Sequence, residues 1–147
     1  MNPTLPRLLQ LASPALPVGA YTYSQGLEWA VESGLVHDQA SALAWIAALL
    51  EEGIGCFEAP LTGQLQRAWA AAEHAEIERL NADFLASRES SELRAETLQM
   101  GYSLRRLLHE LDDLVLPPAF DALAEVSFPV GWALAADGWK IPLADSL

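Results

Sequence analysis

The sequence predicts an all-α fold, and three observations support this prediction. Just over half of the 147 residues are hydrophobic, and many of them are Ala or Leu, which favour helix. Apolar residues recur at spacings of three and four along almost the whole chain, as they do on one face of a helix. The alternation of apolar and polar residues that is typical of a strand is sustained nowhere. We therefore expect a helical bundle of about 6–8 helices.

No internal repeat and no linker long enough to separate domains interrupts this pattern. The length is that of one domain with a substantial hydrophobic core. We therefore expect a single domain over residues 1–147.

The stretch Ser13–Glu28 combines two prolines and two glycines with a signal for the start of a helix. The prolines fix φ, and Gly19 allows a positive φ or a close approach by another segment. Thr22 and Gln25 have the spacing of a capping box, which predicts a helix that starts at Thr22 and continues beyond Leu27. Two interpretations stay open: a rigid loop that presents aromatic side chains to a partner, and a well-packed N-terminal turn.

The next helices are bounded by capping residues and glycines. Gly34 is expected to end the first helix, and Asp38 to cap the start of the second. Glycines and a proline between residues 53 and 60 predict a break or kink there. The second helix carries an apolar stripe of Leu43, Ile46, Leu49 and Leu50.

Three longer helices follow, at Leu61–Ala72, Glu76–Ala86 and Ser91–Leu111. Gly101 lies inside the third. A glycine at such a position costs about 1 kcal/mol relative to alanine. We therefore expect another helix to pack closely against Gly101.

Prolines mark the start of two further elements near the end of the chain. Pro118 and Pro129 are each tolerated in the first turn of a helix, and the second of these helices is expected to end near Gly138. Asp145 or Ser146 is a candidate N-cap with no helix after it.

The balance of charge excludes some classes of partner. The net charge is −12, from 20 acidic and 8 basic residues. Binding to nucleic acid needs a basic face, and anionic membranes repel an acidic protein. No uninterrupted apolar segment reaches the length of a membrane span. We therefore expect neither nucleic acid nor a membrane as a partner.

Cysteine and histidine offer no sign of catalysis or metal binding. Cys56 is the only cysteine, so no intrachain disulfide can form, which fits a cytoplasmic location. Its apolar neighbours predict a buried, inert thiol. His37, His74 and His109 lack partners at metal-ligand spacing. The sequence also contains no phosphate-binding glycine loop. We expect no catalytic residue, no metal site and no cofactor.

One polar group is suggestive. Arg88 and Glu92 are four residues apart and are expected to pair on one helical face, while Arg94 and Arg105 are expected to share another. Two interpretations fit the pattern equally well. One is an ordinary surface ion pair, and the other is an internal polar brace that joins the central helix to the N-terminal loop through Glu28.

Three stretches resemble the urease accessory protein UreF family. Ser13–Glu28 resembles its N-terminal signature almost completely, with mild departures at Ala20 and Tyr21. Asn81–Arg94 resembles its central Arg-x-x-x-Glu-x-Arg segment. Phe128–Ala135 resembles a later proline-containing region with less specificity.

The resemblance implies a urease maturation chaperone rather than an enzyme. Such a protein binds UreD (also called UreH), recruits and regulates the nickel GTPase UreG, and docks on apo-urease. It helps to assemble the nickel metallocentre of urease, and in full-length form it is a homodimer. The residues that the resemblance assigns to a partner-binding surface are Tyr23, Ser24, Gln25, Gly26, Glu28, Arg88, Glu92 and Arg94.

Family members typically continue for further helices. The resemblance therefore implies that the chain is truncated at its C-terminus, which would leave part of an apolar core uncovered. Two alternatives stay open. One is a generic all-α dimeric interaction module. The other is a small helical enzyme that uses Glu28 with an arginine, which a deep pocket and a raised carboxyl pKa would favour.

Overall fold

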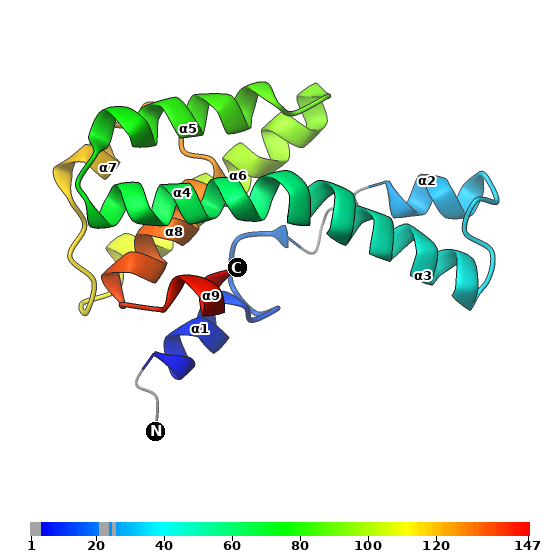
Figure 1. Cartoon of the computed structure of the whole chain (residues 1–147), viewed down its shortest axis with the longest axis horizontal. Coiled ribbons are helices and arrows are strands. Elements are labelled where there is room, and N and C mark those ends of the chain that lie inside the picture. Colours follow the sequence, from blue (N-terminus) through cyan, green and yellow to red (C-terminus); the bar gives the residue numbers. More distant parts are fainter. Residues whose placement is uncertain (1–3, 21–23, 25) are drawn as a thin grey trace.

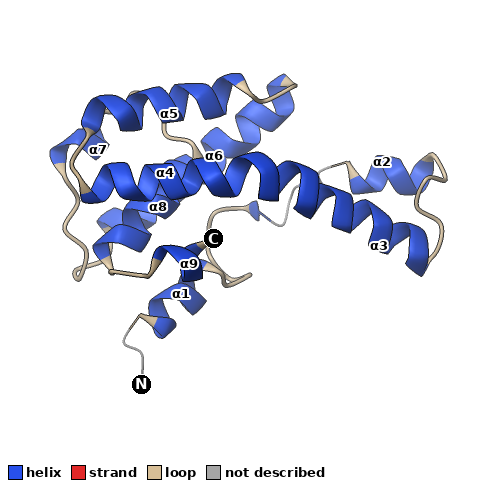
Figure 2. Cartoon of the chain, viewed as in Figure 1, coloured by secondary structure: helices blue, strands red, loops and turns tan. Residues whose placement is uncertain are grey.

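The described part of the chain folds into a helical bundle from which an arm projects (Figure 1). The computed structural model describes residues 4–20, 24 and 26–147. Within these residues every regular element is a helix (Figure 2), which confirms the all-α prediction. In chain order the elements are α1 (Leu5–Leu11), α2 (Leu27–Glu32), α3 (Gln39–Ala48), the π-helix η2 (Leu49–Glu58), α4 (Ala59–Ala70), α5 (His74–Ala86), α6 (Ser91–His109), α7 (Pro118–Ala122), α8 (Phe128–Gly138) and α9 (Leu143–Ser146).

The elements α3, η2 and α4 run on without interruption as one helix, Gln39–Ala70. Counted this way, the described residues form eight helices, as the sequence predicted. Of the predicted break or kink between residues 53 and 60, the break is wrong, because the chain passes Gly53 and Gly55 within a π-helix. Pro60 is accommodated at the first turn of α4.

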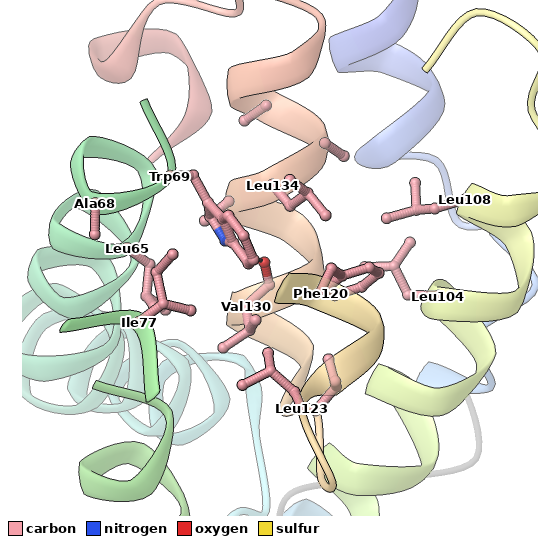
Figure 3. Packing of buried hydrophobic residues seen from close by; sticks show 14 of the residues in the cluster. Leu65, Ala68, Trp69, Ile77, Leu104, Leu108, Phe120, Leu123, Val130 and Leu134 are labelled. Atoms are coloured by element: carbon pink, nitrogen blue, oxygen red, sulfur yellow. Dashed lines mark hydrogen bonds between the residues drawn. The ribbon is translucent and has the colours of Figure 1, made fainter. Parts of the chain in front are cut away.

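The core lies where α8 packs between α4 and α6 (Figure 1). Phe120 from α7 and Trp69 from α4 meet edge to face in this core, with ring centroids 6.0 Å apart (Figure 3). The indole Nε1 of Trp69 donates a hydrogen bond to the carbonyl oxygen of Val130 at 3.2 Å. The buried residues of α4 and α5 include Leu61, Leu65, Ala68, Trp69, Ile77, Leu80, Phe84 and Leu85. Ala72, the last residue of the predicted helix Leu61–Ala72, lies beyond α4 and is exposed.

Gly101 is required by a close approach, but a loop rather than a helix makes it. A Cβ at this position would overlap the carbonyl oxygen of Val126, which belongs to the segment that leads into α8. The predicted close contact at Gly101 is confirmed, but the predicted partner, a helix, is wrong. The backbone of Val126 can approach α6 this closely because residue 101 has no side chain.

Buried polar side chains hold the same segment. The amide of Asn81 donates to the carbonyl oxygen of Glu125 at 2.8 Å and accepts from the backbone N–H of Ser127 at 3.1 Å. The hydroxyl of Thr97 accepts from the backbone N–H of Phe128 at 3.2 Å. These bonds satisfy backbone groups that would otherwise be buried without a partner.

The arm, defined as residues 26–58, comprises α2, α3 and η2 and extends away from the bundle (Figure 1). Gly34 ends α2 with φ of +79°, and Asp38 caps α3 by accepting from the backbone N–H of Ser41 at 2.8 Å. Both capping predictions are confirmed. Neither α3 nor η2 contains a buried residue.

Two predictions at the ends of the chain are corrected. The sequence pattern did not predict the helix α1 near the start of the chain. At the other end, Asp145 and Ser146 do not cap a helix but lie inside the four-residue helix α9, which follows Pro142. The starts of α7 at Pro118 and of α8 around Pro129, and the end of α8 at Gly138, are as predicted.

By length and composition, the Gln39–Ala70 helix could cross a membrane, and its most apolar stretch is not buried in the described structure. Those two properties alone are weak evidence for a span. Glu51 and Glu52 lie near the middle of this helix.

Candidate functional site

The first group of predicted site residues lies where the N-terminal segment enters α2. Tyr23 and Gln25 are outside the described residues. Ser24 is exposed, and its carbonyl oxygen accepts from the backbone N–H of Leu27 at 3.0 Å. The predicted capping box of Thr22 and Gln25 lies outside the described residues. Among those that are described, Ser24 is not helical and α2 begins at Leu27.

Gly26 explains the later start of α2. Its φ is +84°, a left-handed conformation that side-chain-bearing residues rarely adopt, and it occupies the N-cap position. A Cβ added at Gly26 would lie 3.7 Å from the indole ring of Trp45 in α3. Gly26 therefore turns the chain into α2 beside α3, whereas Glu28 in the first turn of α2 is exposed to solvent.

Arg88, from the second predicted group, connects the end of the arm to the bundle. Its Nη1 lies 2.7 Å from Oε1 of Glu58, and its guanidinium carbon lies 4.2 Å from the centroid of the Phe84 ring. Only 17% of the Arg88 side chain is exposed. The predicted pair with Glu92 is wrong, because α5 ends at Ala86 and α6 begins at Ser91, so the two residues do not share a helix.

Glu92 instead belongs to the start of α6. Its backbone N–H, followed by the hydroxyls of Ser90 and Ser91, lowers the pKa of the Glu92 carboxyl below its ordinary value. The hydroxyl of Ser90 also caps the helix by accepting from the backbone N–H of Leu93 at 3.2 Å. Glu92 thus stabilises a helix end and joins neither arginine.

Arg94 and Arg105 both reach the segment that precedes α8. Arg94 pairs with Glu125 at 2.6 Å, and Arg105 donates to the carbonyl oxygens of Phe120 and of Leu123, the latter at 3.0 Å. The prediction that Arg94 and Arg105 lie on one face of α6 is confirmed. The predicted brace to the N-terminal loop is wrong, because the partners come from residues 120–125, and no ion pair among the described residues involves Glu28.

Arg88 and Arg94 each line a hollow. One of about 190 Å³ lies beside Glu58 and Arg88, and Phe84 and Met100 also line it. A wider and shallower one of about 530 Å³ lies beside Arg94 and Glu125. Glu28 lines neither of them.

Carboxyl, histidine and cysteine side chains are the candidates for metal binding or acid catalysis among the described residues. The described residues contain no group of three His, Cys, Asp or Glu side chains that could hold a metal ion. The carboxyl pKa values of Asp38, Glu76 and Glu92 are all lowered by hydrogen bonds, so none of these three is a carboxyl held neutral for acid catalysis. Cys56 is exposed rather than buried as predicted, with its thiol 3.1 Å from the carbonyl oxygen of Glu51.

The sequence pattern missed the most extensive feature of the surface. Nine of the fourteen large apolar side chains that are exposed among the described residues belong to the arm. They are Trp29, Val31, Leu35, Leu43, Ile46, Leu49, Leu50, Ile54 and Phe57. One signal was present in the sequence: no Lys or Arg occurs between Arg7 and Arg67, so this apolar stretch has only acidic charges around it.

Comparison with known proteins identifies the family. The family model described as UreF matches residues 36–147. The Urease accessory protein UreF of Dechloromonas aromatica is 61% identical over 140 residues, which cover 93% of this chain and 61% of that protein. The protein of the same name from an Azoarcus species is 59% identical over 145 residues, covering 96% of this chain and 62% of that protein.

A third relative is longer still. The Bifunctional urease accessory protein UreEF of Bordetella bronchiseptica is 48% identical over 140 residues, which cover 94% of this chain and 32% of that protein. The chain thus spans about three fifths of the length of its first two relatives. On the family match and these identities, the chain belongs to the UreF family of urease accessory proteins.

Proposed function

We propose that this chain acts in urease maturation as a protein-binding chaperone that helps to assemble the nickel metallocentre of urease. Its membership of the UreF family, whose members are accessory proteins and not enzymes, is the observation that carries the proposal. One feature of the described residues supports it: they expose an apolar arm of the kind that binds other proteins.

The finer proposal concerns the partners. The chain binds UreD/UreH, recruits the nickel GTPase UreG and docks on apo-urease, while nickel and nucleotide are held by those partners. To regulate UreG it must bind one nucleotide state of UreG more tightly than the other, because equal affinity for both would shift nothing. A cytoplasmic location and a homodimeric full-length form belong to the same proposal.

The Bordetella relative supports a role exercised together with other accessory proteins. Its name describes a bifunctional accessory protein, and the part similar to this chain covers only 32% of it. Two accessory activities that share one chain are held close to each other at high effective concentration.

Complementation tests the coarse proposal. The chain is expressed in a urease-positive bacterium whose own UreF gene has been deleted, and urease activity and urease-bound nickel are measured. A version extended to the length of the relatives is tested in parallel. Restoration of both quantities by at least one version is expected. Failure of both versions, with each shown to be folded by circular dichroism, would contradict a role in urease maturation.

Co-purification tests the finer proposal. The chain is affinity-tagged and co-expressed with UreD and UreG, and the eluate is resolved by size-exclusion chromatography. A stable complex that contains UreD is expected, with more UreG retained in one nucleotide state than in the other. Complementation without any such complex would keep the role in maturation and remove these partners.

A further inference from the structure

The arm is mostly uncovered: within it only Ala30 and Val36 are buried, and Phe57 stacks on Phe84 of the bundle. α3 consists of Ala, Leu, Trp and Ile except for Gln39 and Ser41, and none of its residues is buried. Leu43 is 68% exposed and Leu50 is 53% exposed. A helix that is hydrophobic all round is normally buried in protein or lipid, because its exposure to water is unfavourable.

The charge on the arm has a single sign. Residues 8–66 contain six acidic side chains and neither Lys nor Arg. Glu58 is paired with Arg88 and Asp38 caps α3, so both have partners within the protein. The other four, Glu28, Glu32, Glu51 and Glu52, are exposed and take part in no ion pair within the described residues. The apolar surface is therefore bordered by carboxylates without a counter-charge.

A lipid bilayer fits this surface poorly. Glu51 and Glu52 are adjacent and lie near the middle of the Gln39–Ala70 helix. A charged side chain at the centre of a bilayer is unfavourable, and two of them act together here. Anionic headgroups would repel the same carboxylates.

A second copy of the chain also fits poorly. Two copies paired through their arms would bring carboxylates against carboxylates, and like charges in a contact oppose association. A basic partner would reverse the sign of that interaction, since each exposed glutamate would face an opposite charge as the apolar side chains become buried.

We propose that the arm is a docking surface for a partner protein that presents an apolar face bordered by Arg and Lys. The inference rests on the proposed function as a binding protein of urease maturation, and it adds the chemistry of one partner's contact surface. Apolar burial supplies the affinity, while the carboxylates speed the encounter and exclude acidic partners.

A pair of synthetic peptides tests this chemistry. Each has about 18 residues and forms an amphipathic helix with Leu on one face. One peptide carries Lys and Arg beside the Leu stripe, and the other carries Glu at the same positions. Binding to the 147-residue chain is followed by fluorescence anisotropy at roughly 50 and 200 mM NaCl, which differ in screening length. The basic peptide is expected to bind at least about tenfold more tightly, and less tightly at the higher salt concentration.

Matched variants locate the binding. Glu51→Lys with Glu52→Lys, and separately Leu43→Ser with Leu50→Ser, are expected to weaken binding of the basic peptide about tenfold or more. Glu110→Lys with Asp112→Lys makes the same change of charge on the bundle. Val115→Ser removes a side chain that is 92% exposed there. Both controls are expected to keep the affinity within about twofold of the unsubstituted chain.

Several results would overturn the proposal. Equal binding of the two peptides, or equal loss in the bundle variants, would show that the arm has no specific role. Self-association that Leu43→Ser with Leu50→Ser abolishes, without peptide binding, would make a second copy the occupant. If the chain floats with phosphatidylcholine vesicles and the same variant does not, the occupant of the arm surface is lipid. A chain extended to the relatives' length that no longer binds the peptide would place the cover within the protein itself.

Urease activation separates this inference from the proposed function. In the deletion strain, the charge-reversed arm variant is compared with the unsubstituted chain or, if only the extended version complements, with that version. Activation by the unsubstituted protein but not by the arm variant supports both the maturation role and the docking inference. Full activation by the arm variant overturns the docking inference and leaves the maturation role intact. Failure of both proteins, with selective peptide binding retained, removes the maturation role and leaves the docking chemistry supported.

Discussion

Two helices of similar composition have opposite surroundings in this protein. α8 and α3 are both mostly apolar, with Trp, Ala and Leu in each. α8 contains seven buried residues, and α3 contains none. The difference comes from neighbours, because α8 lies between α4 and α6, whereas α3 continues the α4 helix out of the bundle (Figure 1).

This contrast separates two uses of apolar sequence. In the bundle, close packing converts apolar area into stability of the folded state. In the arm, the same kind of area stays in contact with water and is available for binding. Substitutions that are severe in the bundle should therefore be mild for stability in the arm.

The largest effect is expected from truncation of the central aromatic residue of the core. Phe120 is fully buried against Trp69, and Arg105 lies over its ring. Phe120→Ala should lower the free energy of unfolding by about 3–5 kcal/mol, measured by urea denaturation. Leu43→Ala in the arm should change it by less than about 0.5 kcal/mol. Similar losses for the two variants would mean that the arm is packed in solution.

A glycine in each region provides the next test. Gly101→Ala should destabilise the protein by about 3 kcal/mol, because its Cβ would overlap the backbone of Val126, which cannot move as a flexible side chain would. A Cβ at Gly53 in the arm would meet no atom within 4 Å. Gly53→Ala should therefore stabilise the protein by up to about 1 kcal/mol. Thermal denaturation of both variants checks the opposite signs, and equal signs would contradict the difference.

The ion pair between arm and bundle should contribute less. A double-mutant cycle with Arg88→Ala and Glu58→Ala should give a coupling free energy of about 1 kcal/mol, because Arg88 is largely shielded from water. The more exposed Arg94 and Glu125 pair, treated in the same way, should give a smaller value. The opposite ranking would show that Glu58 does not fasten the arm to the bundle.

The smallest effect concerns the acid sensitivity of the arm. The backbone N–H and hydroxyl of Ser41 lower the pKa of Asp38 below its ordinary value of 3.8. Because the folded-state pKa is the lower one, the contribution of the carboxylate to stability is complete above the unfolded-state value. It is lost as the pH falls through the folded-state value. The protection of α3 amides against hydrogen exchange, taken relative to the intrinsic exchange rate at each pH, should therefore fall below about pH 4.

Asp38→Asn is the control for this effect. Asn can still accept the capping hydrogen bond but does not titrate in this range. The acid-dependent loss of protection should disappear in the variant. If it persists unchanged, another group causes it.

Much of the local structure could be predicted from the sequence. Gly34, Asp38 and Pro118 mark helix ends through their own backbone preferences and side-chain hydrogen bonds, which act over a few residues. Such local signals did not indicate that α2 begins at Leu27, since a capping-box spacing does not show that Gly26 adopts a positive φ.

The candidate site could be predicted only in part. Arg88 and Arg94 were identified, but their partners Glu58 and Glu125 lie 30 and 31 residues away. A helical spacing rule cannot find such partners, because it assumes that one helix carries both residues. Which carboxylate meets which arginine depends on how α5 and α6 are joined and on where α8 begins.

The sequence by itself determined the helical class, most helix ends, the acidic charge and the family resemblance. Each of these is a property of composition or of neighbouring residues. Tertiary structure alone decided which apolar helices are buried, which arginine meets which carboxylate, and that α3 stands in solvent while α8 forms the core. The physical reason is that burial and ion pairing depend on segments distant in sequence, and no local pattern specifies which of them will meet.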